Sequence, residues 1–182
     1  MKDLYTACRL LALLTVLTGI VYPLAVTGPG QFFFSSQSAG SPVVQAGMVR
    51  GSLLVAQKFK EDKFFQSRPS AGDYETMPSS ASNLSPVAQK QLEAVQARMK
   101  SYPGAGSEFY YASASGLDPD ISPRSAAVQM ERVAKARCTS LDEVRAAVNQ
   151  KTRQAVLEPP LINVLELNLL LEEKEYACKP GT

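Results

Sequence analysis

Residues Leu10 to Val26 read LLALLTVLTGIVYPLAV, an uncharged stretch made mostly of Leu, Val, Ala and Ile. A membrane-spanning helix needs about 20 apolar residues, and ~17 is the short end of the range. The uncharged segment is longer than this core, because no charged residue follows Arg9 before Arg50. We therefore predict one transmembrane anchor over residues 10–30.

Two other interpretations of this stretch compete with a membrane anchor. A secretory signal peptide has an apolar core of ~7–15 residues and a small-x-small cleavage site. The core here is longer, and the best cleavage candidate, Ala25-Val26-Thr27, has a poor last residue. A buried core helix would show a polar face, and none interrupts the run. The pattern favours a retained anchor, with a cleaved signal peptide as the next alternative.

The flanking charges predict the orientation of the anchor. Lys2 and Arg9 precede it, whereas the other side carries no charge before Arg50. Basic residues flanking a span are enriched on the cytoplasmic side. We therefore expect a cytoplasmic N-terminus of residues 1–9, an anchor in the cell (inner) membrane, and an extracytoplasmic domain of residues 31–182.

Composition narrows the class of that domain. The chain has 19 Lys and Arg against 17 Asp and Glu, a formal net charge of +2, which is no electrostatic footprint for nucleic acid. The part beyond the anchor is long enough for one domain with a real core. Cys8 lies at the cytoplasmic end, while Cys138 and Cys178 lie beyond the anchor. A disulfide between these two and a pair of unrelated thiols both remain open.

Local signals predict a helix-rich α+β domain with a small sheet. Ser-Pro pairs are typical helix starts, and Ser140 with Glu143 forms a capping box. The expected helices begin at Ser85-Pro86, Ser122-Pro123 and Ser140, and the last covers 163–174. Strands are expected at 48–59 and 108–112, and loops at 34–41, 71–84 and 113–120. A short extended piece is expected to begin at Phe64-Phe65 and to be closed by Arg68-Pro69-Ser70. The inner faces of the first two helices are expected to be Ala88, Leu92, Val95 and Met99, then Ala126, Met130, Val133 and Arg137.

Catalytic machinery is hard to assemble from this composition. The chain has no His, which excludes a Ser-His-Asp triad and a His-ligated zinc site. Asp118 and Asp120 flank Pro119; a contact with a cation is possible, but a turn in which Asp bonds its own backbone is favoured. Arg68 is an isolated cation that either pairs with an acid of the fold or reaches a partner. Arg132, Lys135 and Arg137 look basic, but Glu131 four residues before Lys135 favours an ordinary solvated face.

Several motifs together resemble a known family. The most specific runs from 112 to 123, ASASGLDPDISP, and continues with RVAKAR at 132–137. Others are VRGS at 49–52, RPSA at 68–71, SNLSP at 82–86, NVLELNL at 163–169, YPL at 22–24 and GQ at 30–31. They cover almost the whole chain in one order. The chain thereby resembles the C subunit (KdpC) of the bacterial Kdp P-type potassium-transporting ATPase.

This resemblance implies a non-catalytic accessory subunit of an ATP-driven, high-affinity potassium import complex. Its implied partners are a channel-like potassium-conducting subunit, a P-type catalytic subunit and a small membrane subunit. The Asp-Lys-Thr-Gly-Thr phosphorylation motif of the catalytic subunit is absent here. No cofactor is expected from the chain's own motifs, since ATP and potassium are handled by the complex. The family is described as a catalytic chaperone that raises the ATP affinity of the P-type subunit.

The expected orientation leaves only a short segment on the side where ATP lies. Clamping or gating of the channel subunit's outer mouth is therefore favoured over direct nucleotide contact. The residues predicted for a partner interface are Gly19, where a small residue lets membrane helices approach, and Gln31, Arg68, Asp118 and Asp120. A membrane-anchored extracytoplasmic binding protein for a small solute is the alternative, and an exported enzyme that uses carboxylates alone is a third possibility.

Overall fold

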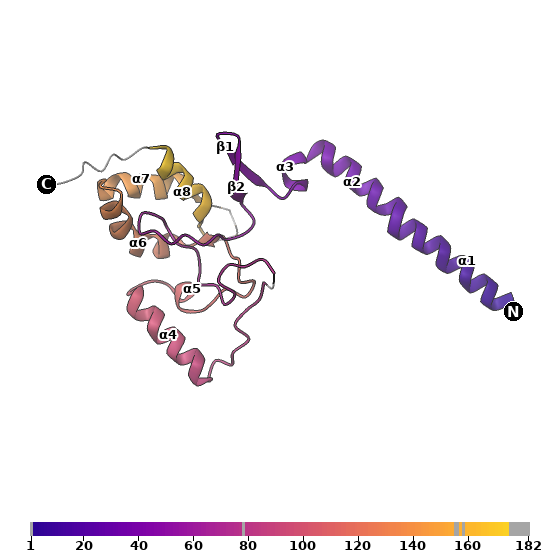
Figure 1. Cartoon of the computed structure of the whole chain (residues 1–182), viewed down its shortest axis with the longest axis horizontal. Coiled ribbons are helices and arrows are strands. Elements are labelled where there is room, and N and C mark those ends of the chain that lie inside the picture. Colours follow the sequence, from indigo (N-terminus) through magenta and orange to yellow (C-terminus); the bar gives the residue numbers. More distant parts are fainter. Residues whose placement is uncertain (1, 78, 155–156, 158, 175–182) are drawn as a thin grey trace. The chain divides into compact units, whose positions relative to one another are not determined.

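The structure is a computed structural model that describes residues 2–77, 79–154, 157 and 159–174 (Figure 1). The chain forms two compact units, residues 1–43 and residues 44–182. Each unit is described by itself.

The N-terminal unit is built on one continuous helix, Lys2–Phe33 (Figure 1). It consists of α1 (Lys2–Val16), the π-helical turn η1 (Leu17–Val21) and α2 (Tyr22–Phe33). Its mean hydropathy reaches 2.1 and none of that stretch is buried, which contradicts a buried core helix. Length and composition make it a candidate membrane span, although a signal sequence shares both properties. The helix extends beyond the predicted span, residues 10–30, at both ends.

A short helix and a hairpin follow the long helix. The expected loop 34–41 contains α3 (Ser35–Ser38). Strands β1 (Pro42–Gln45), which was not predicted, and β2 (Met48–Ser52) form a two-stranded sheet. Ala46 and Gly47 between them both have positive φ, 52° and 75°, as the two central residues of a tight hairpin turn require.

The predicted strand 48–59 is wrong beyond Ser52. The hydroxyl oxygen of Ser52 accepts a hydrogen bond from the Leu54 N–H at 3.1 Å, which closes a turn. The carbonyl of Leu53 then accepts from the Asn163 side chain at 3.0 Å, and the Ala56 N–H donates to Leu117 at 2.9 Å. Distant partners therefore hold this apolar stretch as irregular chain.

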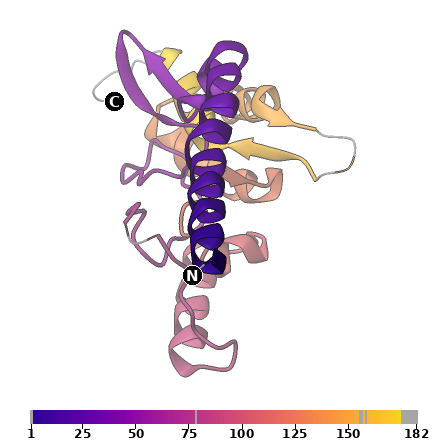
Figure 2. The ribbon, with the colours of Figure 1, turned by 90° about the vertical axis from the view of Figure 1, so that its right-hand side faces the viewer.

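The second unit contains a three-stranded antiparallel sheet, and the helices that form its core pack against this sheet. The strand order is β3 (Asp120–Ile121), β5 (Leu161–Asn163), β4 (Thr152–Arg153). Ile162 pairs with Ile121 on one side and with Thr152 on the other, and Figure 2 shows β4 beside β5. None of these three strands was predicted, and Asp120 in β3 was expected to belong to the loop 113–120. Helices α6 (Pro123–Ala136), α7 (Leu141–Lys151) and α8 (Val164–Glu173) pack with this sheet.

The three helix starts of this layer confirm the sequence signals. Ser122 Oγ accepts from the Ser125 N–H, Ser140 Oγ from Glu143 and Asn163 Oδ1 from Glu166, each at 3.2 Å. The predicted inner face of α6 is buried, and the fully buried side chains of the core include Phe65, Phe109, Ile121, Val133, Val144, Ile162, Leu167 and Leu171.

The extended piece predicted to begin at Phe64-Phe65 does not pair with another strand. Side chains bind its backbone N–H and carbonyl groups instead. Asn168 accepts from the Phe65 N–H at 2.8 Å and donates to its carbonyl at 2.9 Å. Gln129 does the same for Gln66, at 2.9 and 3.1 Å. Arg132 donates to the carbonyl of Phe64 at 3.0 Å and Arg137 to that of Lys63 at 2.6 Å.

The hydrogen bonds of Arg132 and Arg137 contradict the solvated basic face that was expected at residues 132–137. Arg137 is only 8% exposed, and its Nη1 also donates to the carbonyl of Leu171 at 2.9 Å. Arg132 and Arg137 therefore have a structural role, because their hydrogen bonds hold residues 63–64 against α6. Lys135 alone is exposed as expected.

Helix α4 (Gln89–Ser101) begins three residues later than the Ser85-Pro86 signal predicts. The Ala88 N–H donates to the Ser85 carbonyl at 2.9 Å, so the Ser-Pro pair forms a turn and the helix has no side-chain cap. The predicted inner face is also wrong, since Leu92 and Met99 are 44% and 48% exposed while Gln91 is buried. α4 contacts mainly α5 and lies away from α6 to α8 (Figure 1).

The predicted strand 108–112 is a short helix, α5 (Ser107–Tyr110). Phe109 is 1% exposed and packs edge-on against Tyr102, with ring centroids 5.1 Å apart. Cys8 is an exposed free thiol. The open question of a Cys138–Cys178 disulfide involves Cys178, which lies outside the described residues.

Candidate functional site

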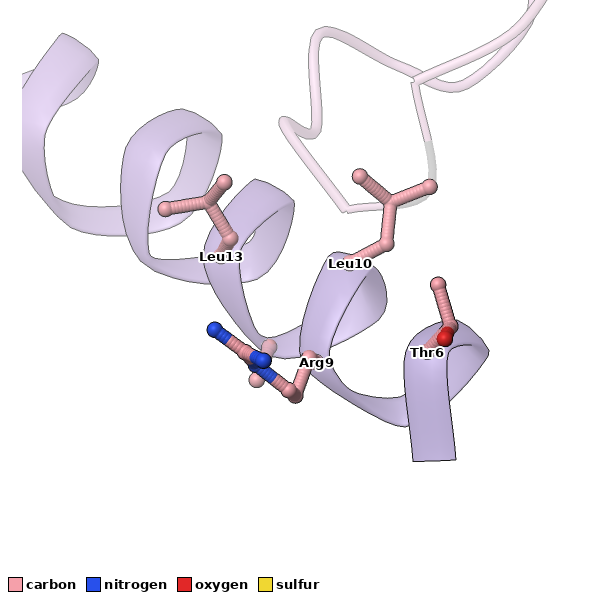
Figure 3. Close-up of a pocket in the computed structure, with 5 residues that line it drawn as sticks. Thr6, Arg9, Leu10 and Leu13 are labelled. Carbon is pink, nitrogen blue, oxygen red and sulfur yellow. The ribbon is translucent and has the colours of Figure 1, made fainter. Parts of the chain in front are cut away.

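A concavity on α1 can be set aside as a site. It is lined by Thr6, Arg9, Leu10, Ala12 and Leu13, which all lie on consecutive turns of one helix (Figure 3). A single helix encloses no ligand, and its apolar surface here belongs to the candidate membrane span. The features that bring distant residues together lie in the second unit.

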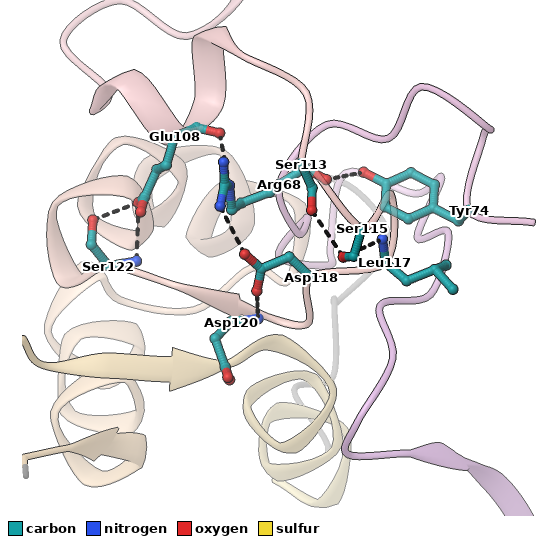
Figure 4. Close-up of polar contacts among 9 residues, drawn as sticks. All are labelled: Arg68, Tyr74, Glu108, Ser113, Ser115, Leu117, Asp118, Asp120 and Ser122. Atoms are coloured by element: carbon teal, nitrogen blue, oxygen red, sulfur yellow. Dashed lines mark hydrogen bonds and ion pairs between the residues drawn. The ribbon is translucent and has the colours of Figure 1, made fainter. Parts of the chain in front are cut away.

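The centre of the candidate site is an ion pair between Arg68 and Asp118 (Figure 4). Nη1 of Arg68 lies 2.8 Å from Oδ2 of Asp118, and the two side chains are 27% and 30% exposed. The Arg68 Nε also donates to the carbonyl of Glu108 at 3.3 Å. Of the two interpretations left open for Arg68, the structure therefore shows pairing with an acid of the fold.

Asp118 uses both of its carboxylate oxygens within the fold. Oδ1 accepts from the backbone N–H of Asp120 at 3.2 Å, which is the turn favoured from the sequence, while Oδ2 receives Arg68. This arrangement fixes the corner of the loop at Pro119. Among the described residues, no group of three or more Cys, Asp or Glu side chains is placed to hold a metal ion.

Asp120 points to the other side of the corner and meets β5. Its Oδ1 accepts from Asn163 Nδ2 at 3.2 Å, and the Pro119 carbonyl accepts from the Val164 N–H at 3.0 Å. Burial raises the pKa of the Asp120 carboxyl, and the hydrogen bond from Asn163 only partly opposes this. An ionised carboxylate that is half-buried lowers the stability of the fold. The surrounding structure therefore holds Asp120 in this position at a cost in folding free energy.

The loop 113–123 is anchored at its first residue and bent near its tip. The Ser113 N–H donates to the carbonyl of Pro69 at 2.8 Å, and Ser113 is buried. Gly116 has a φ of +74°, and a Cβ there would lie 2.7 Å from the carbonyl oxygen of Ser80. Ser79 donates a short hydrogen bond to the carbonyl of Ser115. The loop is thus packed against residues 79–80, and only glycine fits at position 116.

The other end of the loop is tied to α5 and α6. Glu108 Oε1 accepts from the Ser122 N–H at 3.0 Å and from its hydroxyl at 2.6 Å, and Ser122 caps α6 (Figure 4). One connected polar network therefore includes Arg68, Glu108, Asp118, Asp120, Ser122 and Asn163. The network side chains are buried or half-buried, whereas Ala114 and Ser115 at the loop tip face solvent.

The five residues predicted for a partner interface fall into two groups. Arg68, Asp118 and Asp120 lie in the polar network of the second unit. Gly19 and Gln31 lie on the N-terminal helix, where a Cβ at Gly19 would meet nothing within 4 Å and Gln31 is exposed. The structure tests no contact with a partner, so the interface remains a prediction.

Two members of the network were missed from the sequence. Glu108 was placed in a strand, and its bond to Ser122 fourteen residues later has no local signature. Asn163 was recognised only as the start of a helix. Its spacing of three residues before Glu166 is the cap signal, but its contacts with Leu53 and Asp120 depend on the tertiary fold.

Comparisons with known proteins give a consistent result. The model of the family described as "KdpC: K+-transporting ATPase, c chain" matches residues 4–173. A "Potassium-transporting ATPase KdpC subunit" of Pseudomonas entomophila (strain L48) is 47% identical over 175 residues, which cover 91% of this chain and 92% of that protein. Proteins with the same description from Pseudomonas putida (strain GB-1) and Polynucleobacter asymbioticus are 44% and 42% identical. They cover 93% and 94% of this chain, and 96% and 99% of their own lengths.

Proposed function

The chain belongs to the KdpC family, the c chains of K+-transporting ATPases, and on this basis we propose that it is the accessory subunit of an ATP-driven potassium import complex. It supports assembly and turnover of that complex and carries out no catalytic step itself. Its partners are a channel-like potassium-conducting subunit, a P-type catalytic subunit and a small membrane subunit. ATP and potassium are handled by the complex.

The observation that supports this role most directly is the fixed contour of the loop 113–123. Ser113 is bonded to Pro69, Asp118 to Arg68 and Ser122 to Glu108, so the loop is held at its start, its corner and its end. A loop ordered before binding loses less conformational entropy on docking than a free one does. Small exposed residues at its tip, Ala114 and Ser115, suit a close fit to another protein.

The N-terminal helix anchors the subunit in the inner membrane. Its 32 residues at 1.5 Å per residue exceed the ~30 Å thickness of the hydrocarbon core. Lys2 and Arg9 precede its apolar core and no charge follows before Arg50, which supports a cytoplasmic N-terminus and an extracytoplasmic second unit. Gly19 and Gln31 on this helix would contact partner subunits.

In this orientation the second unit docks on the outer mouth of the channel-like subunit. Its polar network keeps the loop tip in place while potassium enters. The catalytic-chaperone description of the family, a raised ATP affinity of the P-type subunit, then operates through the membrane part, because only residues 1–9 lie on the side of ATP. The chain's second unit makes no direct contact with nucleotide.

Purification from potassium-starved cells tests the accessory role. An affinity tag on the full-length chain should recover the channel-like and P-type subunits in fixed proportion, and the same tag on an unrelated single-span protein should recover neither. A chain that purifies without these subunits and binds a small solute by itself would contradict the proposal and support the receptor alternative.

A further inference from the structure

A second concavity, distinct from the loop network, lies between α4 and two stretches of the irregular chain before it. Its volume is about 310 Å³, and residues 70–71, 80–82 and 84 line it on the side of the irregular chain. Gln91, Ala94 and Arg98 form its floor, at spacings of three and four residues that place them on one face of a helix. The volume is at the lower end of the ~300–1,000 Å³ typical of small-molecule sites.

The lining of this α4 cavity is basic. Lys90 and Arg98 both line it, and no Asp or Glu is among its lining residues. Arg98 Nη1 donates to the carbonyl of Tyr110 at 3.0 Å, which fixes the guanidinium on the floor. Neither cation is ion-paired with an acid in the part of the chain that the structure describes. Two positive charges therefore face an opening without a counter-charge.

The cavity also offers an amide donor. Gln91 is 7% exposed as a whole residue and lines the cavity. Its side-chain amide atoms are not among the buried unpartnered atoms of the described residues, so they remain accessible. An accessible amide that lines a cavity can donate from its N–H groups to a ligand there.

The hydroxyl of Ser70, at the wall of the cavity, is oriented by its existing hydrogen bonds. Ser70 Oγ accepts from the N–H groups of Gly72 and Tyr74, at 3.2 and 3.0 Å. Both acceptor positions are then used, which leaves the hydroxyl proton free to donate. Ser80 and Ser82 line the same wall. Hydroxyl and amide donors together with two cations match a group with several negatively charged oxygens.

We propose that the α4 cavity binds a phosphate group. A phosphate offers more acceptor oxygens than a carboxylate, and charge-assisted bonds from Arg and Lys are its usual contacts in proteins. Free inorganic phosphate and the headgroup of an anionic phospholipid both present this group. The inference concerns residues 70–98 alone and is independent of the partner subunits.

Phosphate titration of the full-length chain in detergent tests the site by calorimetry. Lys90→Gln removes a cavity charge, and Lys100→Gln removes the same charge from an exposed position of the same helix. We expect saturable binding to the natural chain and to Lys100→Gln, and about tenfold weaker binding to Lys90→Gln. Gln91→Glu, which places an acid in the cavity, should abolish binding. Thermal unfolding of each variant shows whether its fold is intact.

A second arm uses nanodiscs to identify the source of the phosphate. If free phosphate does not bind, but phosphatidylglycerol and not phosphatidylcholine protects the α4 cavity from hydrogen exchange, with the same Lys90 and Lys100 dependence, the headgroup is the ligand. Binding that is equal in Lys90→Gln and Lys100→Gln, or no response in either arm, would overturn the proposal.

Discussion

Arg68 and Asp118, fifty residues apart in the chain, are joined by a 2.8 Å ion pair at the corner of the most specific motif of the sequence. The pair links the segment after the buried Phe65 to the loop 113–123. Arg68 also donates to the carbonyl of Glu108, and Asp118 also accepts from the N–H of Asp120. Because both side chains bind backbone groups, the ion pair fixes the position of the loop.

The energy of this pair can be measured with a double-mutant cycle. Arg68→Gln, Asp118→Asn and the double variant should show a coupling free energy of unfolding of about 1 kcal/mol, at the upper end for partly exposed pairs. The pair Arg145–Asp142, 53% and 88% exposed, is the matched control and should show about 0.3 kcal/mol. Denaturant unfolding of the full-length chain in detergent provides the measurement. Equal coupling in the two pairs would contradict a positioning role for Arg68.

The pH dependence of stability should reveal the burial of Asp120. Burial raises its folded-state pKa above the ordinary value of 3.8. A carboxyl with a raised folded pKa destabilises the fold while it is ionised, and the penalty is relieved as pH falls through that pKa toward 3.8. Asp120→Asn, which keeps an oxygen to accept from Asn163, should therefore be the more stable protein at pH 7.

Thermal unfolding of the natural chain and Asp120→Asn across pH 4 to 7 tests this sign. The stability advantage of the variant should shrink as the pH is lowered. An advantage that grows toward pH 4 would mean that the ionised carboxylate is stabilised in the fold.

The side-chain amide of Asn168 should contribute more to stability than one ordinary hydrogen bond does. It satisfies both backbone groups of the fully buried Phe65, and Asn168→Leu leaves a buried N–H and a buried carbonyl unpaired. We expect a loss of about 2–4 kcal/mol in unfolding free energy. Asn149→Leu, at an exposed position of α7, is the control and should change stability by less than about 0.5 kcal/mol. Similar losses in both variants would show that Asn168 is not a clamp.

The proposed topology predicts the behaviour of reporter fusions. A reporter that is active only outside the cytoplasm should be active when fused after Lys174 and silent when fused before Arg9. Moving Lys2 and Arg9 to positions after Phe34 should weaken this bias, because the charges set the orientation. Activity from the fusion before Arg9 alone would reverse the topology.

Helix starts could be predicted from the sequence because they are local. Ser122, Ser140 and Asn163 each accept from an N–H three residues later, and no other part of the chain is needed. The same reasoning failed at Ser85, where the chain turns once more before α4 begins. α4 has few packing partners, so its amphipathic pattern does not decide which face is buried.

The sheet could not be predicted, since its strands are two or three residues long and carry no measurable period. β5 pairs with β3 on one side and with β4 on the other, and these pairings depend on the tertiary fold. Phe64-Phe65 and residues 108–112 have the composition of strands, but side chains of Asn168 and Gln129 bind the first, and the second folds into α5 with Phe109 in the core.

The candidate site was predictable in part. Arg68, Asp118 and Asp120 were singled out from their motifs, and the structure joins them into one network. Glu108 and the tertiary role of Asn163 were missed because both act across long sequence separations.

We propose that the loop 113–123 acts on the potassium side of the complex. Ala114 is exposed at the loop tip, so Ala114→Arg adds a bulky charge without breaking the network; Ala146→Arg on the exposed face of α7 is its control. The decisive measurement is ATP hydrolysis by the assembled complex, titrated with potassium and, separately, with ATP. We predict that Ala114→Arg weakens apparent potassium affinity by about tenfold, a change of ~1.4 kcal/mol, at unchanged ATP dependence. A shifted ATP dependence with unchanged potassium dependence would contradict it.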